Sequence, residues 1–164
     1  MFRKMRRFQQ ELSAAETREI FEKESCGVLA CAGDDGYPYA VPLSYVYADG
    51  HIYFHCALEG HKLDAMRRCE KVSFCVVGQD QVIAQELTTY FRSAIAFGRA
   101  RIVEDPQERR EKLTVLGLKY GPELHDYIRE HIDKDGPRAA LIDIEIEHMT
   151  GKEARELMRQ RSKS

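Results

Sequence analysis

Gly60-His61-Lys62 is the segment of this sequence best suited to binding a phosphate group. It follows the strand-like stretch that ends at His55-Cys56-Ala57 and precedes a short helix predicted over 63–68. A glycine permits a sharp turn, and the free N–H groups at a helix start attract an anion together with a lysine ammonium. Taken alone, such a pattern is more often an exposed lysine at a turn, so other segments must decide between the two.

Histidine spacing offers little support for a metal site. His51 and His55 lie four residues apart on a predicted strand and therefore share a face. No Asp or Glu on that strand completes a facial triad, and His51 directly follows a turn, where solvent exposure is expected. His125 and His131 lie six residues apart on a predicted helix, about 600° around its axis, so both are expected at the surface. No metal site and no nucleophile triad is predicted.

Short β-prone runs separated by tight turns must position these residues. Asp-Gly turns at 33–36 and 48–50 predict a three-stranded antiparallel meander over 26–32, 37–47 and 51–56. Further strands are expected at 72–77, 88–103 and 139–146, with a bulge at Gly98.

Helices are expected to flank these strands. Ser13-Ala14-Ala15-Glu16 is a capping box for a helix over 14–23. Pro106 is suited to open a helix that ends at Tyr120, and another is expected over 122–132. The predicted fold is a single α+β domain over 1–164, a mostly antiparallel β-barrel of about six strands. Residues 1–12 are expected to be loose, and 151–164 to form a polar helical tail.

Composition excludes several classes of function. The 164 residues carry a formal net charge of −2, which argues against a nucleic-acid partner because phosphate binding requires a basic excess. The basic segment 3–7 is expected to be solvated. No apolar run reaches the roughly 20 residues that cross a bilayer, and no signal peptide is visible. The five cysteines are odd in number and contain no CxxC pair, which indicates free, buried thiols in a cytoplasmic protein.

Two further segments change how the glycine–lysine turn is interpreted. Val41-Pro42-Leu43-Ser44-Tyr45 and Tyr90-Phe91-Arg92-Ser93, in this order and spacing with Gly60-His61-Lys62, resemble the FMN-binding split-barrel family of pyridoxamine 5′-phosphate oxidase. The similarity is greatest to its nitroimidazole-resistance branch. It extends from about Phe8 to Lys152 and includes the terminal segment Glu147-His148-Met149-Thr150-Gly151-Lys152.

The resemblance implies a homodimer that binds FMN between its subunits. The flavin ring would be contacted by the main chain of Pro42, Leu43, Ser44 and Tyr45, and the ribityl chain by His55, Cys56 and Ala57. The phosphate would be bound by His61 and Lys62. The second subunit would contribute Tyr90, Arg92 and Ser93. Pro42 can offer only its carbonyl. Tyr45 and Tyr90 are also expected as aromatic neighbours of a stacked substrate.

The departures from the family pattern restrict the function. His61 stands where the oxidase has arginine, and Ser44 replaces another basic residue. A phosphorylated substrate beside FMN requires several cations, so vitamin B6 oxidation is not predicted. The implied function is an FMN-dependent oxidoreductase that reduces a small planar acceptor such as a nitroimidazole, with no catalytic residue assigned. The alternatives are a haem protein with His55 or His61 as axial ligand, and a non-catalytic flavin carrier or sensor. A deazaflavin in place of FMN stays open.

Overall fold

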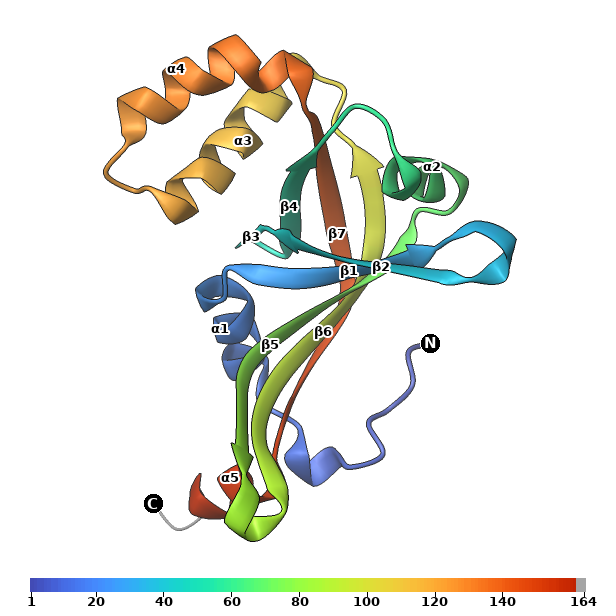
Figure 1. Cartoon of the computed structure of the whole chain (residues 1–164), viewed down its shortest axis with the longest axis vertical. Coiled ribbons are helices and arrows are strands. Elements are labelled where there is room, and N and C mark those ends of the chain that lie inside the picture. The colour runs from blue at the N-terminus through green and yellow to red at the C-terminus, as the bar shows by residue number, and fades with distance from the viewer. Residues whose placement is uncertain (162–164) are drawn as a thin grey trace.

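The computed structural model describes residues 1–161, which form one seven-stranded antiparallel sheet in the order β2-β1-β5-β6-β7-β4-β3 (Figure 1). The strands are β1 (Cys26–Ala32), β2 (Pro38–Ser44), β3 (Val46–Ala48), β4 (His51–Cys56), β5 (Lys71–Ile83), β6 (Thr88–Ile102) and β7 (Ala140–Glu153). β2 and β3 occupy the two ends of this order, although only Tyr45 separates them in the chain, so the sheet must curl to bring its ends together. The two strands do not pair with each other, so the barrel stays open. The predicted α+β split barrel is confirmed.

Tyr45 divides the run that the sequence predicts as one strand over 37–47. Its side chain is fully buried, its hydroxyl donates to the Phe21 carbonyl at 2.8 Å, and its N–H donates to the Tyr120 hydroxyl at 3.0 Å. The Tyr45 N–H and carbonyl, which a continuous strand would give to a neighbouring strand, both bond to the Tyr120 hydroxyl instead. β2 therefore pairs with β1, β3 pairs with β4, and the predicted three-stranded meander is wrong.

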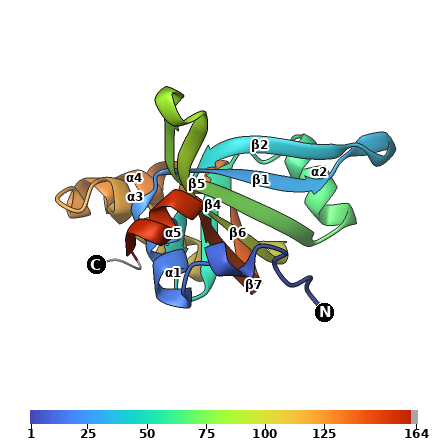
Figure 2. The same ribbon diagram turned by 90° about the horizontal axis from the view of Figure 1, so that it is seen from below.

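Five helices surround the sheet, with α3 and α4 on one side and α2 on the opposite side (Figure 2). They are α1 (Ala14–Lys23), α2 (His61–Arg68), α3 (Pro106–Tyr120), α4 (His125–Asp135) and α5 (Arg155–Arg161). The capping box is confirmed, since the Ser13 hydroxyl accepts the Glu16 N–H and the Glu16 carboxylate accepts the Ser13 N–H. Pro106 opens α3 as predicted, with Asp105 as its N-cap.

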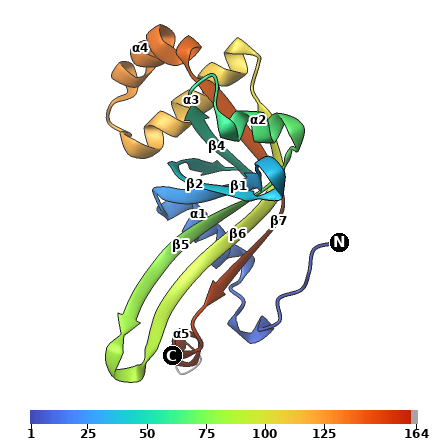
Figure 3. The same cartoon turned by 45° about the vertical axis from the view of Figure 1, so that its right-hand side comes forward.

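β5, β6 and β7 extend beyond the barrel as a curved arm (Figure 3). β5 and β7 are longer than predicted, because residues 78–83 and 147–153 continue the strand pairing although they lack a clear apolar alternation. The predicted irregularity at Gly98 is confirmed as a register shift between Phe97 and Gly98. A Cβ at Gly98 would lie 2.3 Å from the Glu145 carbonyl oxygen, which explains the glycine.

Residues 10–12 pack on this arm. Leu12 is buried, Glu11 pairs with Lys152, and the Gln10 side chain donates to the Glu153 carbonyl at 2.8 Å. Residues 10–12 are therefore not loose, and 151–153 belong to β7 rather than to a tail. Within residues 1–161, no helix combines the length and apolar character needed to cross a bilayer.

All five cysteines are free thiols. Cys31 is buried as predicted, Cys26 is exposed and the other three are half-buried. The expectation of buried thiols therefore fails for Cys26, which begins β1 on the outward face of the strand.

Candidate functional site

The start of α2 has the features of an anion site. Gly60 precedes the helix with φ of 130°, a conformation that favours glycine, and no side chain among the described residues caps the first turn. The Gly60 carbonyl accepts the N–H groups of Leu63 and Asp64, so the preceding N–H groups of His61 and Lys62 face outward from the helix end. The helix begins two residues earlier than predicted, which places both residues in its first turn.

Lys62 faces the end of β4. Burial raises the pKa of the Cys56 thiol, and the nearby Lys62 ammonium opposes that rise. The same ammonium, with Arg68, opposes the rise that burial causes in the pKa of Cys31. The Lys62 charge therefore acts on one thiol of β4 and one of β1, while Ala57 lies exposed in the loop between β4 and α2.

His61 contacts the β1–β2 turn rather than standing free. Its ring lies 4.2 Å from that of Tyr39, and its Nε2 lies 3.4 Å from Oδ2 of Asp34. Arg68 binds the other oxygen of Asp34 at 2.6 Å. These contacts link the β1–β2 turn to α2, the helix whose start is the predicted phosphate site.

Ser44 and His55 line one cavity of about 410 Å³. The chain continues from Ser44 through Tyr45 into β3, and β3 pairs with β4, which brings the two residues side by side. Both side chains are exposed, Ser44 on the outward face of β2 and His55 on that of β4. Pro42 is also exposed, whereas Leu43 packs against the core. The barrel therefore brings together two of the predicted flavin-contacting segments, and β4 leads directly toward Lys62.

Most of the remaining wall of this cavity comes from α3 and α4, which were not predicted to take part, and the rest from the segment that follows α4. The contributing residues are Leu113, Leu116, Gly117, Tyr120, Tyr127, Ile128, His131, Ile132, Asp135, Gly136 and Ala139. A signal is present in the sequence, since the α3 members recur at helical spacing, as do four of the α4 members. His131 is exposed, as predicted, and also lines this cavity.

The predicted stacking role of the Tyr45 side chain is wrong. That side chain is fully buried, and burial raises the pKa of its hydroxyl above the usual range. The Tyr120 hydroxyl lies 2.8 Å from the Tyr45 carbonyl and 3.0 Å from its amide nitrogen. Because Tyr120 occupies both groups, the main-chain contacts predicted for this strand remain predictions for Pro42, Leu43 and Ser44.

Tyr90, Arg92 and Ser93 lie in the first part of β6, which pairs with the end of β5. That end of the two strands is the arm, away from α2 (Figure 1). About 30 Å of extended strand separates Ser93 from the end of β6 beside α2. Tyr90 donates to Glu86, and Arg92 binds the fully buried Glu153 at 3.1 Å. These three residues are not brought to the Lys62 turn within one chain.

Apolar side chains cover the outward face of the sheet between these two regions. Paired residues on neighbouring strands share a face. One such row runs across five strands through Pro42, Val28, Cys75, Ile95 and Thr150, and the next through Ala40, Ala30, Ser73, Phe97 and His148. Val28, Ile95 and Phe97 are each more than a third exposed. Phe2 stacks on His148 and Phe97 at one end of the second row.

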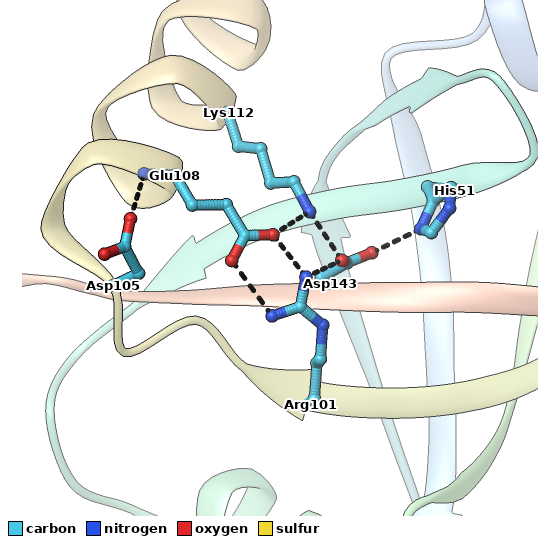
Figure 4. A network of polar contacts seen from close by, with 6 residues as sticks. All are labelled: His51, Arg101, Asp105, Glu108, Lys112 and Asp143. Carbon is cyan, nitrogen blue, oxygen red and sulfur yellow. Dashed lines mark hydrogen bonds and ion pairs between the residues drawn. The ribbon is translucent and has the colours of Figure 1, made fainter.

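A separate polar cluster surrounds Asp143 (Figure 4). Its buried carboxylate is 2.8 Å from His51, 2.7 Å from Arg101 and 2.6 Å from Lys112. Burial raises the pKa of Asp143, but hydrogen bonds from Lys112 and His51 outweigh it and hold the pKa below its usual value. Glu108 also binds Arg101 and Lys112, and its pKa falls to about 2 mainly through the hydrogen bond from Arg101.

This cluster holds α3 against β4, β6 and β7. Because three side chains already bind the Asp143 carboxylate, it is not available as a catalytic acid or base. His51 is half-buried and bonded rather than solvated as predicted. Within residues 1–161, no group of His, Cys, Asp and Glu is arranged to hold a metal ion.

The sequence profile of the family described as pyridoxamine 5′-phosphate oxidase matches residues 13–153. No curated protein matches the chain significantly. Among solved structures, an FAD-binding protein from Mesorhizobium loti is 29% identical, covering 88% of this chain and 96% of that chain with a TM-score of 0.64.

Two more distant structures share the fold. A candidate 5-nitroimidazole antibiotic resistance protein from Bacteroides thetaiotaomicron is 20% identical, covering 87% of this chain and 85% of that chain with a TM-score of 0.71. An FAD- and haem-binding protein from Mycobacterium smegmatis is 18% identical, covering 89% of this chain and 74% of that chain with a TM-score of 0.78.

Proposed function

The chain belongs to the pyridoxamine 5′-phosphate oxidase family, and on that premise we propose that it is an FMN-dependent oxidoreductase whose acceptor is a small planar compound such as a nitroimidazole or another nitroaromatic. The observation that carries the proposal is that Ser44 and His55, which the β3–β4 pairing brings side by side, line one cavity, and that β4 leads from there to the α2 start. An elongated cofactor could contact both regions at once.

The donor chemistry at the α2 start fits the phosphate of FMN. Lys62 supplies a fixed positive charge, and the uncapped first turn supplies N–H groups that need an acceptor. The Mesorhizobium loti structure is named for binding FAD. We propose FMN, which carries one phosphate group, because the features of the Gly60-His61-Lys62 turn suit a single phosphate.

The protein's own residues would then position and shield the reacting groups. Reduction of a nitro group to a nitroso group takes up two electrons and two protons and releases one water. Bound reduced flavin would supply the electrons, and an external two-electron reductant such as a reduced nicotinamide would regenerate it. Ser44 can donate a hydrogen bond to the acceptor oxygen. His55, at the cavity, can hold or move a proton. The apolar walls from α3 and α4 exclude water.

The purified protein is expected to show flavin absorbance and to release FMN on denaturation. In anaerobic stopped-flow mixing, chemically reduced protein should recover the oxidised spectrum at a rate that rises with nitroimidazole concentration. Reduced flavin that persists for minutes beside millimolar acceptor would rule out nitroreduction and favour a carrier or sensor.

A haem-handling protein is the second candidate function. His55 lies exposed beside an apolar cavity, a suitable setting for an axial ligand. The Mycobacterium smegmatis structure, named for FAD and haem binding, shares this fold. A Soret band in the purified protein, with no flavin absorbance, would select this candidate.

We also propose a homodimer joined through the apolar outward face. That face lies between the Lys62 turn and the arm that carries Arg92, so a second copy seated on it could supply the Tyr90–Ser93 contacts.

Light scattering at micromolar concentration should give about twice the 18.9 kDa chain mass. Ile95→Lys, at the centre of the face, should yield monomers with little bound FMN, whereas Val82→Lys on the exposed arm should not. A monomeric wild-type protein that holds FMN stoichiometrically would contradict the shared site.

A further inference from the structure

The cavity between the helical pair and the barrel has a defined chemical character. Leu113, Leu116, Ile128 and Ile132 give it aliphatic walls from both helices. α3 and α4 approach closely there, since a Cβ at Gly117 would lie 2.8 Å from the Ile128 side chain. At about 410 Å³, the cavity falls in the lower part of the ~300–1,000 Å³ range of small-molecule sites.

Aromatic groups line the mouth of the cavity on α4. The Tyr127 ring stacks on the His131 ring at 5.0 Å with an interplanar angle of 29°. Tyr127 is 60% exposed, so its ring has a face that no other residue covers fully. A planar ligand entering the cavity can continue this stack.

The charges of the lining disfavour anions. None of the lining residues is lysine or arginine, and Asp135 contributes a carboxylate. Asp135 lies 3.7 Å from His131 and 3.4 Å from Arg138, whose side chain is 83% exposed and outside the lining. A phosphate or carboxylate on the ligand would find no fixed cation in the cavity, while Ser44, His55 and His131 can hydrogen-bond to a neutral oxygen.

We infer that this cavity is the acceptor-binding site and that it takes uncharged aromatic compounds of one or two rings, excluding phosphorylated and carboxylated ones. The inference rests on the proposed function, because Ser44 and His55 join the cavity to the position proposed for the flavin. It adds the substrate class and assigns α3 and α4 as the elements that select it.

The test compares two probes of similar size, neutral 4-nitrobenzyl alcohol and anionic 4-nitrobenzoate, by calorimetry and by steady-state turnover. The alcohol should bind at least tenfold more tightly to the wild-type protein. Tyr127→Ala should weaken binding of the alcohol about two- to tenfold through loss of stacking. Asp135→Lys should reduce or reverse the preference for the alcohol. Glu130→Ala, on the same helix but outside the lining, should change neither.

Bound FMN is measured separately by absorbance in every variant. If FMN binds and nitro compounds are reduced, but Tyr127→Ala and Asp135→Lys leave affinity and KM unchanged, the cavity is not the acceptor site. If the protein binds no flavin and shows no turnover, yet the alcohol binds in a Tyr127-dependent manner, the proposed function fails while the ligand class stands. Equal binding of both probes to the wild-type protein would overturn the inferred selectivity.

Discussion

Replacing Asp143 with alanine is expected to lower the free energy of unfolding by about 3 kcal/mol. Removing one member of a buried charge cluster typically costs ~3–5 kcal/mol because the remaining charges lose their partner. Lys112, His51 and Arg101 all point at this carboxylate (Figure 4). The lower end of the range applies because Glu108 still binds Arg101 and Lys112. Urea denaturation monitored by circular dichroism measures the change.

A surface ion pair provides the matched control for Asp143. Asp133 binds Arg110 on the exposed faces of α3 and α4, so Asp133→Ala should cost less than about 1 kcal/mol. An Asp143→Ala variant as stable as this control would show that the cluster is not structural.

Acid titration gives a second measurement on the same cluster. The pKa of Asp143 is lowered in the folded protein, so its stabilising contribution is present above about pH 4 and is lost as the pH falls through the folded-state pKa. Stability should therefore fall less steeply with acid in Asp143→Asn than in the wild-type protein.

Lys62→Ala is expected to weaken FMN binding about ten- to a hundredfold. A charge-assisted hydrogen bond contributes about 1.5–3 kcal/mol, and the Lys62 ammonium lies beside an uncapped helix start. Fluorescence titration of the apoprotein with FMN, whose emission is quenched on binding, measures the dissociation constant.

Arg67 provides the control on the same helix. It is exposed and bound to Asp64, one turn from the proposed site. Arg67→Ala should leave FMN affinity within a factor of two, while the affinity of Lys62→Ala should vary less with salt than that of the wild type. An unchanged dissociation constant in Lys62→Ala would remove this lysine from the site.

Local sequence signals predicted most of the elements correctly. The Ser13 capping box, Pro106 at the start of α3 and the irregularity at Gly98 each depend on a few neighbouring residues. The break at Tyr45 was not predictable in this way, because it depends on a hydroxyl from Tyr120, 75 positions later in the chain. The extensions of β5 and β7 likewise depend on pairing with β6 rather than on their own apolar pattern.

The candidate site also has parts that neighbouring residues predict and parts that depend on distant ones. The Lys62 turn is contiguous in sequence, so glycine, lysine and helix start were visible together. Burial of the Tyr45 side chain could have been predicted from strand alternation, since Leu43 and Tyr45 share the inward face while Pro42 and Ser44 face outward. The α3–α4 wall had a helical apolar spacing, but only the folded chain shows that this stripe faces Ser44 and His55.

The open sheet leaves two edge strands, and both are poor templates for a further strand. β3 is only three residues long, and β2 carries Pro38 and Pro42. Proline has no N–H, so within a ladder it occupies positions whose nitrogen faces away from the paired strand, here β1. The free side of β2 therefore lacks backbone donors at both prolines, which protects the protein against edge-to-edge aggregation. Any second chain must consequently be received on a face of the sheet rather than as an added strand.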